Sequence, residues 1–371
     1  MMQAVRRLME QASPRLFGAA GCHVGLHLGG ERLSAAQMQP TSSGLAVHTA
    51  GTLELGCPWY AMLCEPRRFR QALKRFWADH GFRGCKVVAA MPQEQLKVFT
   101  IDYMAAQGQS DAEVIAGEVK DRFKGKGRSM VVDFVPVRQA TQEERSREAV
   151  VAVAAREDVT AFLDLLGRAG LQVRALDIAG MALRRVVPWI GAPELQNTLL
   201  VHIGPASSQL MVVSGRRLVL DRSIEFSEQR LVSRLARLLD LPAQAAKRLL
   251  GEHGTRARQR PQSGEMDAVL REIVGAELVL LKTEVSKTLH YAASKTRGNG
   301  VEKILLVGDI AGFPGIAQSL GTGLGKPVDV LDPLSTFPHR LTGEQAADLS
   351  THCGVTVAIG LALRDLPGPA A

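Results

Sequence analysis

The chain has 371 residues, of which 46% are hydrophobic and 22% charged, and its net charge is +8 at pH 7. This composition excludes an intrinsically disordered or fibrous protein and provides enough apolar residues for two ordinary domains or one large two-lobed one. Aromatic residues make up only 5% of the chain and are not interleaved with the basic residues, which argues against nucleic-acid binding by base stacking. The positive charge instead favours attraction to an anionic membrane face or to an acidic partner segment.

The cysteine pattern and the absence of targeting signals bear on the compartment. The cysteines are scattered, odd in number and without a Cys-x-x-Cys pair: Cys22, Cys57, Cys64, Cys85 and Cys353. This pattern predicts a reducing compartment and argues against a disulfide framework or a zinc ribbon. The N-terminus carries charges where a secretory signal would be apolar, and the longest apolar runs fall far short of the roughly 20 residues that span a bilayer. We therefore expect a soluble cytoplasmic protein.

Residues 1–20 are expected to form an N-terminal helix or tail. A helix here would place Val5 and Leu8 on one face, with Arg6 and Arg7 beside them. That pattern suits either a membrane-surface anchor or a short helix that packs or frays. We favour the short helix.

An internal echo suggests two lobes. Residues 22–38 and residues 199–213 each read as an apolar strand, a His-apolar-Gly step, a short polar turn and a second alternating strand. This order is typical of a β-hairpin with Gly at the entry to the turn. Two such hairpins, at Gly29 and Gly204, predict two lobes of related architecture.

Between the hairpins, strand and helix signals alternate. Period-two alternation and buried apolar runs predict four strands, and capping residues with helical spacing predict two helices, the second closed by Gly170. In chain order the elements are strands 85–91 and 96–104, helix 111–124 with Asp111 as its cap, strands 129–137 and 148–155, and helix 157–170. This ββαββα order predicts a small α+β insert at about residues 85–172.

The second half of the chain is richer in helix. An amphipathic helix is predicted at 228–241, a basic loop at 251–264, and a long helix with a continuous apolar stripe from about Met266 to Ala293. Residues 303–325 then read as a buried strand, a Gly-rich turn and a helix, which is an α/β element.

Residues 304–333 resemble the adenosine-binding element of actin-like ATPases, and they are most similar to the PilM family of pilus assembly proteins, including the Leu-Gly-x-Pro-Val strand after the helix. Residues 351–366 resemble the closing helix of that family, and residues 154–187 resemble the step from its inserted domain into the first connecting helix. The two hairpins fall where the family has its phosphate loops. From about residue 20 to residue 366 the chain resembles PilM or its relatives of the mannose-sensitive haemagglutinin (MSHA) pilus.

The resemblance implies an α/β, actin-like (ribonuclease H-like) fold of two lobes around a nucleotide cleft. The ββαββα insert is then the extra SHS2-type (1C) subdomain, which the division protein FtsA also has. Lobe I is expected at residues 21–195 and lobe II at residues 196–371, with a helical subdomain at about 226–295. The resemblance also implies a partner, the cytoplasmic N-terminal tail of a PilN-like inner-membrane protein, held in a groove that involves the insert.

The phosphate loops of the resembled family begin Asp-x-Gly, and the Asp organises Mg²⁺ as a hard oxygen ligand. Here His27 and His202 stand in place of both acids, and imidazole is a poor ligand for Mg²⁺. Glu31 adds a negative charge to the first loop, and Pro205 removes a backbone N–H from the second. The sequence therefore predicts a degenerate nucleotide site.

Several small residues would still contact a nucleotide if one bound, although the glycines equally suit plain hairpins and a helix entry. These candidates are Gly29, Gly30 and Ser34 in the first loop, Gly204, Ser207 and Ser208 in the second, and Gly308, Asp309 and Gly312 in the adenosine turn. Asp309 occupies a position where the family usually has Gly. We expect ATP or ADP with Mg²⁺ to bind weakly or not at all, and we expect no catalytic residue and no metal centre.

Two further motifs have simple explanations. His23 and His27 point to one face of a strand, but two ordinary strand residues explain them better than a metal site. Residues 124–129, KGKGRS, lack the spacing of a P-loop and follow a helix, so a solvated basic turn is the better interpretation.

The leading hypothesis is a cytoplasmic scaffold of type IV or MSHA-type pilus biogenesis that is peripheral to the inner membrane through its partner. Its dock for the PilN-like tail is expected on the insert, around residues 85–137, by strand addition or by side-chain pockets. The alternatives are an active actin-like ATPase or sugar-kinase-like phosphotransferase, and the cytoplasmic domain of an L-type protein of type II secretion. Self-association stays open, and no nucleic-acid partner is expected.

Overall fold

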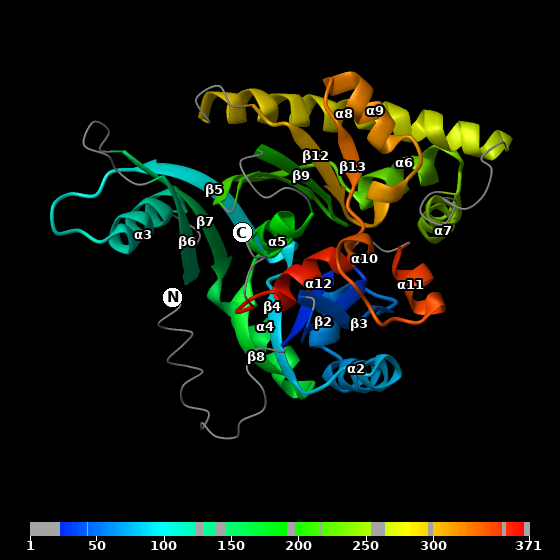
Figure 1. Cartoon of the computed structure of the whole chain (residues 1–371), viewed down its shortest axis with the longest axis horizontal. Helices are drawn as coiled ribbons and strands as arrows, with labels where there is room; N and C mark the ends of the chain where they lie inside the picture. The colour runs from blue at the N-terminus through cyan, green and yellow to red at the C-terminus, as the bar shows by residue number, and fades with distance from the viewer. Residues whose placement is uncertain are drawn as a thin grey trace.

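The computed structural model describes residues 23–42, 44–123, 129–138, 146–190, 197–215, 217–253, 264–295, 300–350 and 354–366. Two five-stranded sheets form two lobes, and a three-stranded sheet lies to one side of them (Figure 1). The predicted N-terminal helix, the P-loop-like run at 124–128 and most of the basic loop lie outside the described residues. Among the described helices, none is both long enough and apolar enough to cross a bilayer.

Lobe I is built on a sheet with the strand order β3-β2-β1-β4-β8. Its strands are β1 (Val24–Gly29), β2 (Arg32–Thr41), β3 (Gly44–Glu54), β4 (Lys86–Ala90) and β8 (Gln172–Asp177). β1, β2 and β3 pair antiparallel, whereas β1, β4 and β8 run parallel. The short η1 (Trp59–Leu63) and the helices α2 (Pro66–His80) and α4 (Arg156–Arg168) supply buried residues to a core on one face, among them Trp59, Phe69 and Phe162.

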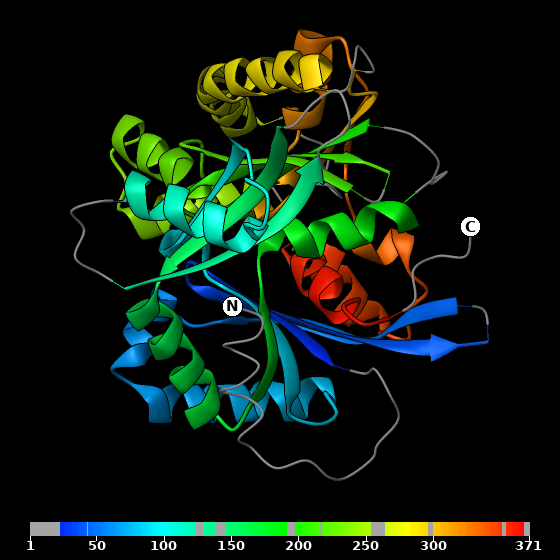
Figure 2. The ribbon, with the colours of Figure 1, turned by 90° about the vertical axis from the view of Figure 1, so that its left-hand side faces the viewer.

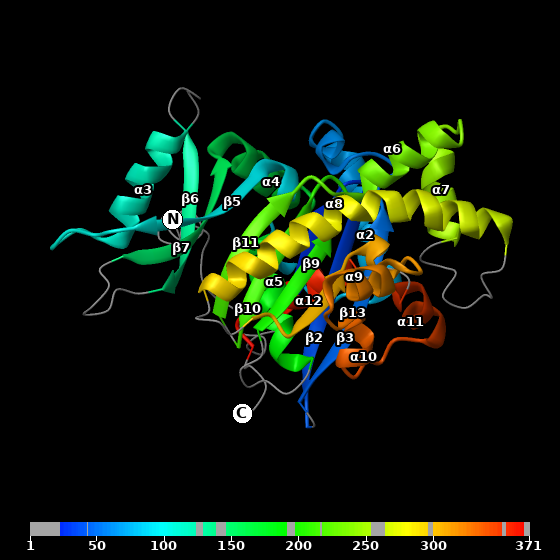
Figure 3. The same cartoon turned by 90° about the horizontal axis from the view of Figure 1, so that it is seen from above.

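Lobe II repeats this sheet with the order β11-β10-β9-β12-β13. Its strands are β9 (Asn197–Ile203), β10 (Ser208–Ser214), β11 (Arg217–Ile224), β12 (Lys303–Val307) and β13 (Val328–Val330). The outer face is covered by α6 (Glu228–Leu238), α7 (Ala243–His253), α8 (Glu265–Lys295) and α9 (Ile316–Leu324). The long α8 runs across the whole lobe (Figure 3). The two predicted hairpins, β1–β2 and β9–β10, are therefore confirmed, and they occupy equivalent places in the two sheets.

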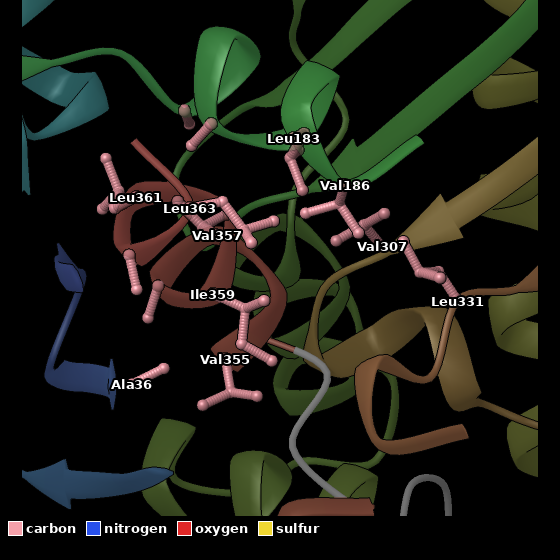
Figure 4. Packing of buried hydrophobic residues seen from close by; sticks show 14 of the residues in the cluster. Ala36, Leu183, Val186, Val307, Leu331, Val355, Val357, Ile359, Leu361 and Leu363 are labelled. Atoms are coloured by element: carbon pink, nitrogen blue, oxygen red, sulfur yellow. The ribbon is translucent and has the colours of Figure 1, made fainter. Parts of the chain in front are cut away.

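Two helices pack between the sheets and join the lobes (Figure 2). α5 (Ala179–Val186) follows the last strand of lobe I and packs on β10 and β11, while α12 (Val355–Ala362) follows lobe II and packs on β1, β2 and β4. Their shared core includes Leu183, Val186, Val357 and Ile359 (Figure 4). The neighbouring helical elements are the one-turn η3 (Val187–Trp189), α10 (Pro333–Thr336) and α11 (Gly343–Ser350).

These two helices approach so closely that glycine is required. A Cβ at Gly360 would overlap the carbonyl oxygen of Ala182, and a Cβ at Gly25 would overlap that of Ala358. Because backbone atoms cannot move aside as a flexible side chain can, a larger residue at Gly360 would force α5 and α12 apart, and one at Gly25 would force β1 away from α12.

The insert is a three-stranded antiparallel sheet with the order β5-β7-β6 and one helix. Its elements are β5 (Leu96–Tyr103), α3 (Asp111–Arg122), β6 (Met130–Arg138) and β7 (Arg147–Ala155). α3 buries Ile115 and Val119 against one face of the sheet. The cap of α3 is Ser110, which forms a capping box with Glu113, so the cap lies one residue before the predicted Asp111.

The structure corrects the predicted ββαββα composition of the insert. β4 pairs with β1 and β8, so it belongs to the sheet of lobe I, and α4 packs into the core of lobe I. The reason is that β4 is an interior parallel strand and is buried on both faces, so its apolar run did not reveal which sheet it joins.

Candidate functional site

The turns of the two hairpins face each other across the cleft between the lobes. A cavity of about 340 Å³ lies there, next to the short η2 (Gln93–Gln95) and the start of η5 (Asp309–Gly312). Of the predicted nucleotide-contacting residues, the cavity is lined by Gly29, Gly30, Ser34, Gly308 and Asp309. Gly204, Ser207, Ser208 and Gly312 are not part of its lining.

The hydroxyl of Ser208 already has a partner. Its Oγ is fully buried and donates to the carbonyl oxygen of Phe226 at 2.7 Å. The bond fixes the segment that follows β11 to the start of β10, and it leaves this hydroxyl unable to donate a bond to a phosphate.

His27 and His202 sit at equivalent positions near the ends of β1 and β9. Their ring centroids are 6.2 Å apart, in an edge-to-face arrangement. Burial lowers the pKa of His27 to about 3, with a further contribution from the nearby His202, and burial lowers the pKa of His202 to about 4. Both imidazoles are therefore neutral at pH 7. The cleft thus has two uncharged rings at the equivalent positions of its two hairpins.

The hairpin turns also touch each other. A Cβ at Gly30 would lie 2.9 Å from Cβ of Pro205, and a Cβ at Gly29 would lie 3.7 Å from Cγ of the same ring. The first turn is held in this place by its own lobe, because its carbonyl oxygen at Gly30 accepts from the N–H of Trp59 at 2.8 Å. The pyrrolidine ring of Pro205 thus fills the space directly in front of the first glycine turn.

Two ion pairs cross the cleft from lobe I to lobe II. The guanidinium of Arg32, at the start of β2, binds the carboxylate of Asp309, which also accepts from the N–H of Gly354 at 3.1 Å. Beside it, Nζ of Lys247 on α7 lies 2.6 Å from Oε2 of Glu31. The two residues of lobe I that follow the glycine turn are therefore both bound to lobe II.

The lining of this cavity is acidic although the chain as a whole is basic. Its charged residues are Glu31, Glu54, Glu94, Glu228, Asp309, Arg32 and Lys247. Both cations are in ion pairs with carboxylates, since Arg32 binds Glu54 as well as Asp309. An anionic ligand entering this cavity would meet an excess of negative charge.

Sequence reasoning missed both cations of the cleft. Arg32 closely follows the glycine turn, so the sequence placed it near the cleft, but the sequence did not reveal that it binds Asp309 of lobe II. Lys247 is 216 positions from Glu31, and nothing local marks it as a cleft residue.

The structure places His23 and His27 in different surroundings. Nε2 of His23 lies 3.5 Å from Oδ2 of Asp365, while His27 faces His202. Within the described ranges, no three His, Cys, Asp or Glu side chains gather in a way that would hold a metal ion.

Comparison with protein families identifies the chain. The family model described as type IV pilus assembly protein PilM matches residues 68–366. The chain belongs to the PilM family. A comparison with curated proteins gives no match.

Solved structures agree with the PilM assignment at the level of the fold. A chain of the PilM-PilN type IV pilus biogenesis complex superposes with a TM-score of 0.73 at 21% identity, over 93% of this chain and 98% of that one. The ethanolamine utilization protein EutJ from Carboxydothermus hydrogenoformans gives a TM-score of 0.54 at 14% identity, over 98% and 96% of the two chains. The predicted α/β, actin-like, two-lobed fold is thereby confirmed.

Proposed function

We propose that this PilM-family chain is a cytoplasmic scaffold of type IV pilus biogenesis that holds the tail of a PilN-like inner-membrane protein, and that its cleft is a degenerate nucleotide site, as in a pseudo-ATPase. Family membership and the likeness to a PilM-PilN complex support the scaffold. The degenerate cleft rests on one observation: the two ion pairs, Arg32–Asp309 and Glu31–Lys247, cross the place where the hairpin turns would hold phosphates.

A magnesium nucleotide fits these residues poorly. Two neutral imidazoles offer Mg²⁺ no carboxylate oxygen. Phosphate oxygens would have to displace Glu31 and Asp309 from their cations, and would then lie beside unneutralised carboxylates. The ring of Pro205 also occupies the space at Gly30. These three features together favour the scaffold over an active ATPase or phosphotransferase.

Calorimetry on the full chain tests the degenerate site. ATP or ADP with Mg²⁺ should give no saturable heat, and ATP hydrolysis should not exceed that of a heat-denatured sample. Micromolar, magnesium-dependent binding with turnover would overturn this part of the proposal and restore the ATPase alternative.

The insert remains the proposed dock for the tail, and at its β6 edge the features argue for side-chain contacts instead of strand addition. β6 is an edge strand that pairs with β7 alone. Oδ1 of Asp133 accepts from the N–H of Phe134 at 3.0 Å, and Pro136 has no N–H to offer. Both features protect an edge strand against further pairing.

Exposed apolar surface on the insert supports docking through side chains. Met104, directly after β5, is 70% exposed and is the only large apolar residue so exposed within the described part of the insert. On lobe II, Met266 at the start of α8 is also exposed, at 42%. These two methionines provide a matched pair for a test.

The test is the binding of a fluorescent peptide with the sequence of the PilN-like tail, followed by anisotropy. Met104→Asp should weaken binding by at least tenfold, because a charge placed in an apolar contact must be desolvated. Met266→Asp should leave binding unchanged. If the folded wild-type chain does not bind the tail, the scaffold proposal fails; if both variants bind equally well, the dock lies elsewhere.

A further inference from the structure

The outer face of α2 carries a dense group of cations, which we call the α2 basic face. This 15-residue helix buries Phe69, Leu73 and Phe76 in the core of lobe I. Its exposed side holds five basic residues within nine positions: Arg67, Arg68, Arg70, Lys74 and Arg75. At 1.5 Å per residue these cations extend along roughly 12 Å of one straight helix.

Most of these cations lack an acidic partner. Nη1 of Arg68 lies 3.0 Å from Oε2 of Glu65, whereas Arg67, Arg70, Lys74 and Arg75 form no ion pair with any described residue. Asp79 is the only acid within α2 itself. Such a concentration of unpaired charge is costly unless an anionic partner covers it, because like charges on one helix face repel.

The position of the α2 basic face leaves it accessible. α2 lies on the outer side of lobe I, remote from lobe II (Figures 1 and 2). The neighbouring α4 carries both signs, with Glu157 and Asp164 against Arg156 and Arg168. Of these two neighbouring helices, α2 carries the concentrated basic charge, whereas the cleft between the lobes is acidic.

We propose that the α2 basic face binds an anionic phospholipid surface directly. Exposed Lys and Arg side chains on a helix are attracted to acidic headgroups over about a Debye length. No large apolar side chain of α2 is exposed, so the helix adsorbs by charge without inserting. This goes beyond the proposed function, in which the chain reaches the membrane only through its partner.

The same face suits nucleic acid less well. Single-stranded nucleic acids are held by aromatic side chains on which bases stack. On α2, Phe69 and Phe76 are buried, and the half-buried Trp77 donates its Nε1–H to the carbonyl oxygen of Gly84 at 3.0 Å. Without base stacking, the α2 basic face would recognise only the charge of the phosphates. A membrane presents many such phosphates side by side in one continuous surface.

Co-sedimentation of the full chain with vesicles tests the proposal. Vesicles of 30% phosphatidylglycerol in phosphatidylcholine should bind the chain, and pure phosphatidylcholine vesicles should not. Arg67→Gln/Arg70→Gln/Lys74→Gln should weaken binding about 100-fold, at about fivefold for each charge near the surface. Raising the salt from 50 to 300 mM should weaken the binding of the wild-type chain to the acidic vesicles by about as much, because the Debye length shortens.

A matched triple variant separates this face from net charge. Arg237→Gln/Arg271→Gln/Lys326→Gln removes the same charge from lobe II and should weaken binding much less. Equal losses in the two triple variants, or equal binding to both kinds of vesicle, would overturn the proposal. Binding of a DNA duplex that is tighter than vesicle binding and is lost in the α2 variant would overturn it in favour of nucleic acid. The tail peptide should bind the α2 variant normally, so failure here is distinct from failure of the scaffold.

Discussion

Lobe I and lobe II place equivalent strands in the same order, yet they differ in what the chain adds between those strands. In lobe I, β4 and β8 are separated by the insert, whereas in lobe II, β11 and β12 are separated by α6, α7 and α8. The shared sheets set the cleft and the hairpins that face it. The additions differ in kind and in place, so the same framework carries two different exteriors.

The two lobes also differ inside. In the register of the sheets, His27 corresponds to His202, and two positions earlier Gly25 corresponds to Leu200. On the next two strands, the residues paired with these positions are Ala36 and Ala50 in lobe I, and Met211 and Asp221 in lobe II. The sheet of lobe I thus has only glycine and alanine at these positions beneath α12, whereas the sheet of lobe II has larger side chains, one of them a buried acid, beneath α5.

The largest expected effect comes from the crossing of the two helices. Gly360→Ala should destabilise the protein by about 3 kcal/mol, because its Cβ would overlap backbone atoms of α5. Gly167→Ala in α4 is the matched control, since nothing lies near its Cβ, and it should stabilise by about 0.5–1 kcal/mol. Urea unfolding measures both. Equal free energies of unfolding for the two variants would contradict the close approach of α5 and α12.

The second prediction concerns the two histidines at equivalent places. Because burial lowers both pKa values, the folded protein excludes a proton that the unfolded chain takes up below pH 6.5. The contribution of the two neutral histidines to stability is therefore complete above pH 6.5 and falls with decreasing pH, by about 2 kcal/mol per histidine at pH 5.

Urea unfolding between pH 5 and pH 8 measures this loss. His27→Gln and His202→Gln should each flatten the curve below pH 6.5. A curve for either cleft variant that keeps the slope of the wild type would show that its histidine is accessible to protons in the folded state.

The third prediction concerns Asp221, a buried acid in lobe II whose equivalent in lobe I is Ala50. This carboxyl is buried beside Gly180, and its oxygens find no hydrogen-bond partner among the described residues. Burial raises its pKa to about 7, so the folded state favours the protonated form. The contribution of Asp221 to stability is then complete below pH 4 and falls as the pH rises to 7, by about 1.4 kcal/mol per pH unit. Asp221→Asn should remove this slope while leaving that of the histidines; an unchanged slope would refute it.

The smallest effect is expected for the ion pair between Glu31 and Lys247. Their side chains are 35% and 32% exposed, so solvent screens the pair. A double-mutant cycle with Glu31→Gln and Lys247→Gln should give a coupling of about 0.2–1 kcal/mol that vanishes at 1 M salt. Zero coupling at low salt would mean that the lobes are not joined at this point in solution.

Much of the framework was visible in the sequence, because it is encoded by local patterns. Alternating apolar residues around a glycine turn predicted both hairpins, and helical spacing predicted α3, α4, α6 and most of α8. The expectation that His27 and His202 stand in place of two acids came from the resemblance to a family, once the hairpins had been recognised. These features depend on residues that are only a few positions apart, so the sequence alone contains the pattern that predicts them.

Only the tertiary structure decided which sheet each strand joins and what closes the cleft. β4 joined lobe I because its hydrogen-bonding partners, β1 and β8, lie far away in the chain. The pKa values of the two histidines follow from burial by both lobes, and the Glu31–Lys247 pair joins residues 216 positions apart. Such contacts join residues that are far apart in the sequence and meet only when the chain folds, so no local pattern of residues predicts them.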